Sequence, residues 1–212
     1  IQLIATSLLI LLGIRTHIVY IGEPLNILIT FIWILGITNA FNHLDVLDGV
    51  AGVSAVIISL AFFIISLFNG DIQTAILALA LAGSVSGFLL YNLPPAKVYL
   101  GNCGSHFLGF ILSAIALSIS YAPMSRKIAL LSPILILGFP ILDTAFLILI
   151  RIGKKKIPFK KSNDHLALRF LVLGYSKKKA LVAMSLWALF FAVSGIITSQ
   201  VSNPWGIITV IF

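Results

Sequence analysis

The chain has 212 residues, of which 60% are hydrophobic and 9% are charged, and its mean hydropathy is +1.14. Soluble domains carry about 25% charged residues, so this composition excludes an ordinary soluble protein and indicates an integral membrane protein. The formal charge of +8 does not indicate nucleic-acid binding, because the basic residues are confined to loops between apolar stretches. The one cysteine, Cys103, excludes a disulfide within the chain and offers no thiolate cluster for a metal.

Apolar stretches long enough to cross a membrane follow one another along the chain. A span needs about 20 predominantly apolar residues, and the sequence predicts an all-α, polytopic membrane protein with about eight spans. Six complete spans are predicted at 25–41, 50–68, 72–91, 106–121, 128–150 and 180–199, and two truncated ones at 1–14 and 205–212. We interpret the first stretch as a truncated span rather than a signal peptide, because no basic segment precedes it. We therefore expect residues 1–212 to form a single transmembrane domain, a fragment lacking N-terminal spans and the C-terminus.

The positions of lysine and arginine predict how the spans are oriented. Cytoplasmic loops of membrane proteins carry an excess of both residues. Placing the basic loop 151–179 in the cytoplasm puts 11 of the 14 lysines and arginines inside and leaves Arg15, Arg126 and Lys127 outside. The same orientation places the polar loops 42–48 and 92–105 on the cytoplasmic face. Nearly all of the polar chemistry is thus expected at one surface.

Two amides and two carboxylates recur at every third residue where the span 25–41 ends, at Asn39, Asn42, Asp45 and Asp48. An Asp at the centre of a membrane helix costs about 2.5 to 3.5 kcal/mol on insertion scales, so such groups usually face water, an ion or a partner charge. A continuous helix would turn by about 180° between the first and last of them. We therefore expect a helix end, a turn eased by Gly49, and a new helix capped by Asp48. The alternative is that these groups only cap two helices at the membrane surface.

The loop 91–106 contains the second polar constellation. Two consecutive prolines should end the preceding helix, and Gly101 and Gly104 are expected to bracket a tight turn, with Ser105 capping the next helix. Backbone N–H groups at the start of a helix suit a phosphate, and Lys97 adds a mobile cation. An ordinary connecting loop is the alternative interpretation.

The third constellation lies in the basic segments 154–165 and 174–179. Clustered lysines beside a span often only set topology and attract anionic lipid head groups. His165 and Arg169 are different, because their spacing of four places two donors on one face of a short helix, for which a diphosphate is a plausible target. Asp143 lies inside a predicted span close to Pro140, and we interpret it as structural or supporting.

Taken together, these segments resemble the polyprenyl-phosphate N-acetylhexosamine-1-phosphate transferases (glycosyltransferase family 4). The similarity is greatest to the undecaprenyl-phosphate GlcNAc-1-phosphate transferase branch, which is related to phospho-MurNAc-pentapeptide transferase. Four motifs match in the family's order and spacing. They comprise Asn39, Ala40, Asn42, Asp45, Asp48 and Gly49; Pro95, Ala96, Lys97, Gly101, Gly104 and Ser105; Pro140, Asp143 and Thr144; and Asp164, His165 and Arg169.

The chain also departs from the family's pattern. Asn102 stands where the family has a magnesium-binding Asp, Val46 replaces a Gly, and Ala167 and Leu168 replace the second and third His of the His-rich motif. An amide oxygen can ligate Mg²⁺ but brings no charge, so weaker metal binding is expected. The family's acidic pair with a following Lys is absent from this sequence. In the family it precedes the point where this chain begins, so we attribute its absence to truncation.

The resemblance implies transfer of N-acetylhexosamine-1-phosphate from a UDP-N-acetylhexosamine to a membrane polyprenyl (undecaprenyl) phosphate, releasing UMP. This would be the first membrane step of cell-envelope polysaccharide synthesis, at the cytoplasmic face of the inner (plasma) membrane. The expected cofactor is Mg²⁺, with Mn²⁺ as an alternative, and a homodimer is a candidate assembly. The implied roles are metal binding by Asn42 and Asn102; catalysis by Asp45, Asp48 and His165; and substrate binding by Asn39, Lys97, Gly104, Ser105 and Arg169.

Two alternative functions stay open from the sequence. A catalytically silent homologue that binds lipid phosphate is suggested by Asn102 and by the two missing histidines. A transporter is the other alternative, but transporters place their polar sites near the middle of the bilayer. The enzyme hypothesis requires instead that Asp48, Lys97 and His165 lie at one surface.

Overall fold

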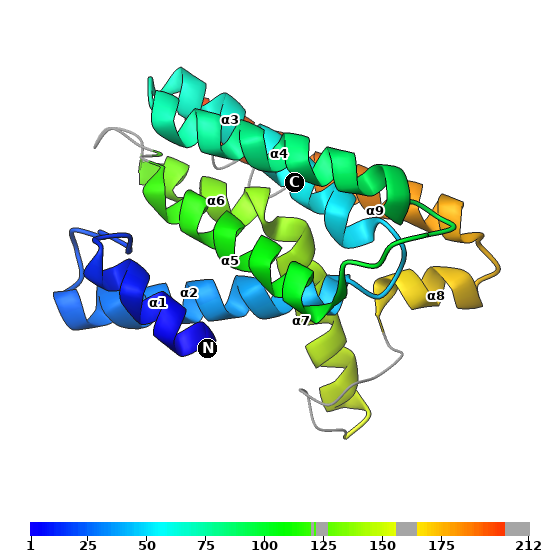
Figure 1. The fold of residues 1–212 in the computed structure, drawn as a ribbon. Helices are drawn as coiled ribbons and strands as arrows, with labels where there is room; N and C mark the ends of the chain where they lie inside the picture. Colours follow the sequence, from blue (N-terminus) through cyan, green and yellow to red (C-terminus); the bar gives the residue numbers. More distant parts are fainter. Residues whose placement is uncertain (120, 122–126, 156–164, 202–212) are drawn as a thin grey trace.

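The computed structural model describes residues 1–119, 121, 127–155 and 165–201, which form helices joined by loops (Figure 1). No strand occurs among these described residues. The elements are α1 (Gln2–Leu11), α2 (Glu23–Leu44), α3 (Val50–Phe68), α4 (Ile72–Asn92), α5 (Gly101–Ser118), the 3₁₀ helix η1 (Lys127–Leu131), α6 (Ser132–Ile136), α7 (Gly138–Gly153), α8 (Leu166–Val172) and α9 (Lys177–Gln200).

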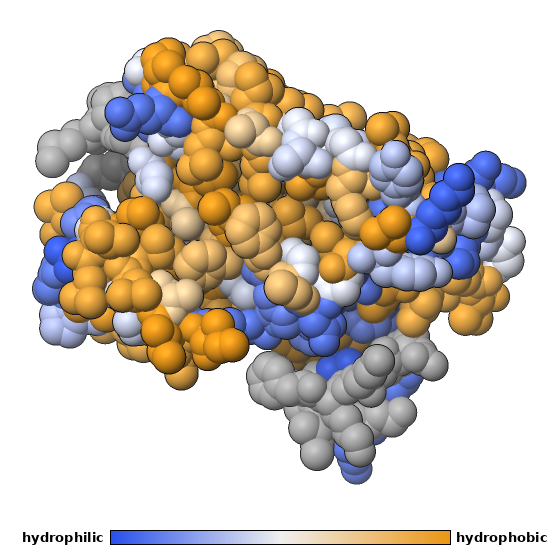
Figure 2. All heavy atoms as spheres, in the orientation of Figure 1, coloured by the Kyte–Doolittle hydropathy of each residue, from blue (hydrophilic) through white to orange (hydrophobic). Residues whose placement is uncertain are grey.

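Five of the described helices, α2, α3, α4, α5 and α9, are long and apolar enough to cross a membrane. A sixth span is present if the bent pair of Ala129–Ile136 and α7 counts as one. The predicted polytopic helical membrane fold is therefore confirmed. The predicted first span contains the shorter apolar helix α1, and the one predicted at 205–212 lies outside the described residues. Figure 2 shows apolar side chains over most of the visible face, with hydrophilic ones gathered toward the end where α9 begins.

The segment predicted as one span at 128–150 is bent by 66° between Ile136 and Gly138. Pro140 explains the place of the break, because a proline ring clashes with the carbonyl four residues earlier and removes one helix hydrogen bond. As the third residue of α7, Pro140 lies in a first turn, where the missing N–H has no helical partner to lose. The break lets α7 leave the bundle at a steep angle (Figure 1).

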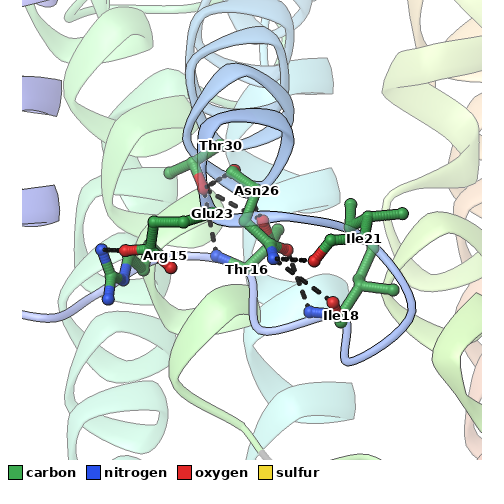
Figure 3. Close-up of polar contacts among 7 residues, drawn as sticks. All are labelled: Arg15, Thr16, Ile18, Ile21, Glu23, Asn26 and Thr30. Carbon is green, nitrogen blue, oxygen red and sulfur yellow. Dashed lines mark hydrogen bonds and ion pairs between the residues drawn. The ribbon is translucent and has the colours of Figure 1, made fainter.

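The loop between α1 and α2 is held by the buried side chain of Asn26 (Figure 3). Its Oδ1 accepts the Ile18 N–H at 2.9 Å, while its Nδ2 donates to the Ile18 and Ile21 carbonyls, each at 3.3 Å. Arg15 and Glu23 form an ion pair beside it. These contacts satisfy the backbone of an irregular segment at the end of the bundle where α2 begins.

Helices α2 and α5 pack closely because Gly109 has no side chain. A Cβ at this position would lie 2.7 Å from the Thr38 Cα and 2.8 Å from the Ile37 carbonyl oxygen, so backbone would have to move. The fully buried side chains of Phe41 and Leu112 belong to the core that these helices share with α3. This close approach matters for function, because the polar residues Asn42 and Asn102 lie on the same two helices.

We predict that Gly109→Ala lowers the stability of the protein by about 1 to 3 kcal/mol, because the added methyl group overpacks the α2–α5 interface. The measurement is thermal unfolding of the purified protein in detergent. Gly87→Ala is the matched control, since Gly87 also lies within a helix but a Cβ added there would meet no atom within 4 Å. The control should leave stability unchanged or raise it slightly. Equal stability of the two variants would contradict the predicted close packing.

Candidate active site

The side chain of Asp48 links three segments that are far apart in the sequence. It lies in the loop between α2 and α3, and its Oδ2 accepts the Ala96 N–H of the α4–α5 loop at 3.4 Å. The same oxygen lies 3.3 Å from the Lys177 Nζ at the start of α9. The α2–α3 loop, the α4–α5 loop and the start of α9 thus meet at one end of the bundle. In Figure 1 this is the end where α4 ends and α9 begins.

The predicted turn between Leu44 and Val50 is present, with Gly49 in the left-handed region at φ +83°. The predicted cap is corrected, because Gly49 and not Asp48 is the N-cap of α3, and no side chain caps that helix. Asn92 satisfies this turn instead: its Oδ1 accepts the Gly49 N–H at 3.1 Å, and its Nδ2 donates to the Val98 carbonyl at 2.9 Å. Asn92 is buried and ties the two polar loops together, a role that we did not predict from the sequence.

Asn42 lies near the end of α2 and contacts the first turns of α5. Its Nδ2 donates to the Asn102 Oδ1 at 3.2 Å and to the Ser105 Oγ at 3.0 Å. The two residues predicted to hold a metal are therefore direct neighbours. Their partner Ser105 also donates to the Gly101 carbonyl at 3.0 Å, as a residue within a helix does.

The start of α5 differs from the prediction. The helix begins at Gly101, so Gly104 and Ser105 lie inside it, and there is neither a tight turn between the two glycines nor a Ser105 cap. The reason is that the chain is already redirected before Gly101, where the Lys97 and Val98 N–H groups both donate to the Tyr91 carbonyl. The helix therefore begins at Gly101, whose φ of +67° favours glycine.

Asp45 and Asp48 bring two carboxylates into one partly buried loop. Burial raises the pKa of Asp45 to about 6, and the negative charge of Asp48 adds to this shift. Among the described residues, no group of three or more His, Cys, Asp or Glu side chains is arranged to hold a metal. A cation here would need amide or substrate oxygens in addition to these two carboxylates.

We predict that Asp45→Asn stabilises the metal-free protein at pH 7.5 by about 1 kcal/mol, after allowance for solvent screening of this partly exposed group. The ordinary pKa of 3.8 rises to about 6 in the folded protein, so the folded state binds the proton more tightly. The cost of ionising Asp45 is therefore fully present above pH 6 and disappears below pH 3.8. Thermal unfolding in a chelator at pH 7.5 and at pH 4 measures this difference. A stabilisation that is independent of pH would contradict the assigned cause.

His165 lies at the N-cap of α8 beside two groups from other helices. Its Nδ1 is 3.7 Å from the Asp143 Oδ2, and its ring centre is 6.1 Å from that of His43. Asp143 is almost fully buried and its Oδ1 accepts the Leu166 N–H at 3.3 Å. Asp143 thus anchors the start of α8, in line with the supporting role expected for it.

The structure places the other predicted site residues, Lys97, Asn39 and Arg169, in different surroundings. Lys97 is exposed and directly follows Ala96, whose N–H contacts Asp48, so the Lys97 backbone lies near that carboxylate. Asn39 instead faces α1, because its Nδ2 donates to the Leu35 carbonyl at 2.7 Å and to the Gln2 Oε1 at 3.4 Å. Arg169 is exposed, with its guanidinium 5.1 Å from the centre of the Phe146 ring.

Asp48, Lys97 and His165 therefore lie at the same end of the bundle, as the enzyme hypothesis requires. Asp48 reaches the loop of Lys97 directly, and His165 contacts His43, which is adjacent to Asn42. The structure does not bring Asn39 to this centre. Asp164, the remaining motif residue, lies outside the described residues. The chemical roles of all of these residues stay predictions.

Lys177 is a further residue of this centre that the sequence did not single out. It is one of several clustered lysines, and nothing local distinguishes it from its neighbours. Its partner Asp48 is 129 positions away in the chain, so only the tertiary structure reveals the contact.

Several helices long and apolar enough to span a membrane, with amides, carboxylates and cations gathered at one end, define a polytopic membrane protein. Residues 1–120 match the family described as Glycosyl transferase family 4. The chain belongs to this family, which confirms the membership predicted from the motifs.

Curated relatives extend this comparison. The chain is 34% identical over 198 residues to the probable undecaprenyl-phosphate N-acetylglucosaminyl 1-phosphate transferase of Bacillus subtilis (strain 168), covering 93% of this chain and 54% of the relative. It is 31% identical over 215 residues to the decaprenyl-phosphate N-acetylglucosaminephosphotransferase of Mycobacterium leprae (strain TN), covering 88% and 54%. A phospho-N-acetylmuramoyl-pentapeptide-transferase of Streptococcus mutans is 34% identical over 103 residues, covering 46% and 30%. The chain spans about half the length of the first two relatives.

Proposed function

We propose that the protein transfers N-acetylhexosamine-1-phosphate from a UDP-N-acetylhexosamine to a polyprenyl phosphate. The observation that carries this proposal is the meeting of three polar segments at Asp48, at one end of an apolar bundle. A site at a membrane surface suits a reaction between a soluble nucleotide and a lipid-borne phosphate. The names of the relatives support a polyprenyl phosphate as the acceptor and an N-acetylglucosamine phosphate as the transferred group.

The reaction is a phosphoryl transfer. An oxygen of the lipid phosphate forms a bond to the phosphorus that carries the sugar, the bond from that phosphorus to the bridging oxygen breaks, and UMP leaves with that oxygen. Such reactions depend mainly on positioning and on neutralising charge. Lys97, His165 and Arg169 are the residues proposed to hold the diphosphate, with the start of α5 at Gly104 and Ser105 close to the same ligand.

The donor set at this site fits a divalent cation such as Mg²⁺, or Mn²⁺ as an alternative. Asp45 and Asp48 supply carboxylate oxygens, and Asn42 and Asn102 supply amide oxygens once an amide turns its oxygen toward the ion. Burial is the main cause of the raised pKa of Asp45 and the charge of Asp48 adds to it, so a cation bound beside these carboxylates would offset the cost of ionising Asp45. When bound, the ion would supply positive charge to offset that of the phosphates.

The proposed location is the inner (plasma) membrane, with the site facing the cytoplasm. The basic residues of the first turn of α9 and those of the sequence segment 151–169 support this orientation through the positive-inside rule. A homodimer and the single transmembrane domain over residues 1–212 stay predictions.

We predict that Asp48→Asn in the full-length protein lowers the rate of UMP release by at least about 100-fold, because the site loses the charge on which its loops converge. The assay supplies UDP-N-acetylglucosamine, undecaprenyl phosphate and Mg²⁺ in detergent. Asp71→Asn is the matched control: Asp71 caps α4 at the opposite end of the bundle, where its Oδ1 accepts the Thr74 N–H at 3.0 Å. Asn also caps helices well, so the control should keep its activity. Undiminished UMP release by Asp48→Asn would contradict the proposal.

Asn102 favours a second candidate function, a silent homologue that binds lipid phosphate without transfer. Its side chain contacts Asn42 but brings no charge to the proposed metal site. If the wild-type protein releases no UMP and Asn102→Asp restores the release, the silent homologue is favoured. UMP release by the wild-type protein excludes it.

A further inference from the structure

Lys177 occupies an unusual position for a lysine. It is the first residue of α9, where the helix dipole is positive and a cation is unfavourable. Its Nζ nevertheless lies 3.3 Å from the Asp48 Oδ2. Lys178 and Lys179 follow it, and within the part of the chain that the structure describes neither has an acidic partner within ion-pair distance. The contact of Lys177 is therefore specific within this cluster.

The two partners differ in exposure. The Lys177 side chain is 57% exposed, whereas that of Asp48 is 14% exposed. Exposed ion pairs contribute about 0 to 1 kcal/mol, and lysine has a flexible stem that lets its ammonium swing into water. The Lys177 contact is therefore weak enough to be exchanged, while Asp48 stays in place through the Ala96 N–H.

The charge at the site also favours exchange. Asp45 lies close enough to Asp48 for their charges to interact, so a single ammonium balances one of two carboxylates. A divalent cation could balance both. It would compete for the same Oδ2 that Lys177 occupies, since two cations repel each other at one oxygen.

We propose that Lys177 is a resident counter-ion of Asp48 that a divalent cation displaces. In the cation-free protein, Lys177 neutralises Asp48 and holds the start of α9 against the α2–α3 loop. Cation binding releases the ammonium toward solvent, beside the exposed Lys97, where a phosphate-bearing substrate would meet it. The inference rests on the proposed function only in naming a divalent cation as the competitor.

The first test measures Mn²⁺ binding to the full-length protein in detergent by electron paramagnetic resonance, without UDP-sugar or lipid substrate. Lys177→Met removes the competitor and should tighten Mn²⁺ binding about two- to fivefold, the range that an exposed ion pair supports. Lys178→Met is the matched control, since it removes the same charge one residue away. It should change the affinity much less.

The second test uses the reciprocity of linked equilibria. If Lys177 weakens cation binding, then cation binding must weaken the contact of Lys177 with Asp48 to the same extent. Amine acetylation followed by mass spectrometry should show faster modification of Lys177 when Mn²⁺ is added, with little change at Lys178. In the Asp48→Asn variant, Lys177 should react quickly with or without Mn²⁺. This readout does not require that the variant still binds the cation.

Unchanged or weaker Mn²⁺ binding by Lys177→Met would overturn the inference, as would equal effects of Lys177→Met and Lys178→Met. Failure of both the wild type and Lys177→Met to bind Mn²⁺ would also overturn it. Tighter Mn²⁺ binding by Lys177→Met in a protein that releases no UMP would leave this inference in place and count against the proposed transfer instead.

Discussion

The carboxylate of Asp48 is the contact on which the arrangement of the polar end depends. One oxygen accepts a backbone N–H from the α4–α5 loop and faces an ammonium at the start of α9. Each loop alone is a short polar connection between apolar helices. Together they form one surface, because a partly buried carboxylate is costly unless it finds donors. Asn92 links the same two loops through its hydrogen bonds with the Gly49 N–H and the Val98 carbonyl.

The apolar bundle positions this surface through close helix packing. Gly109 lets α2 and α5 approach until Asn42 and Asn102 are within hydrogen-bonding distance. The break before α7 has a similar consequence on the other side, because α7 carries Asp143 to the start of α8 and so places His165 near the end of α2. Packing within the apolar bundle therefore determines which polar groups meet.

Local sequence patterns predicted some features of the fold and the site but not the contacts between distant segments. The apolar lengths predicted the spanning helices, and the spacing of polar residues before Gly49 predicted the turn, since both signals are local. The same spacing grouped Asn39 with the other three polar residues, whereas α2 continues to Leu44 and turns the Asn39 side chain toward α1. The start of α5 was misplaced because the preceding loop redirects the chain. The pairing of Lys177 with Asp48 depends on the tertiary fold, to which no local pattern gives access.

The most direct test of the central claim is cross-linking of the α4–α5 loop to the start of α9 in the membrane, with Asp48 and Lys177 left in place. The full-length protein would carry Cys103→Ser, Lys97→Cys and Lys178→Cys, the exposed neighbours of the two residues that contact Asp48, and a flexible bifunctional thiol reagent would be added. The account predicts an efficient cross-link that falls sharply when Asp48→Asn is added, and none when the second cysteine replaces Ser194, about 25 Å further along α9. An equally efficient cross-link with Asp48 and with Asp48→Asn would contradict the account.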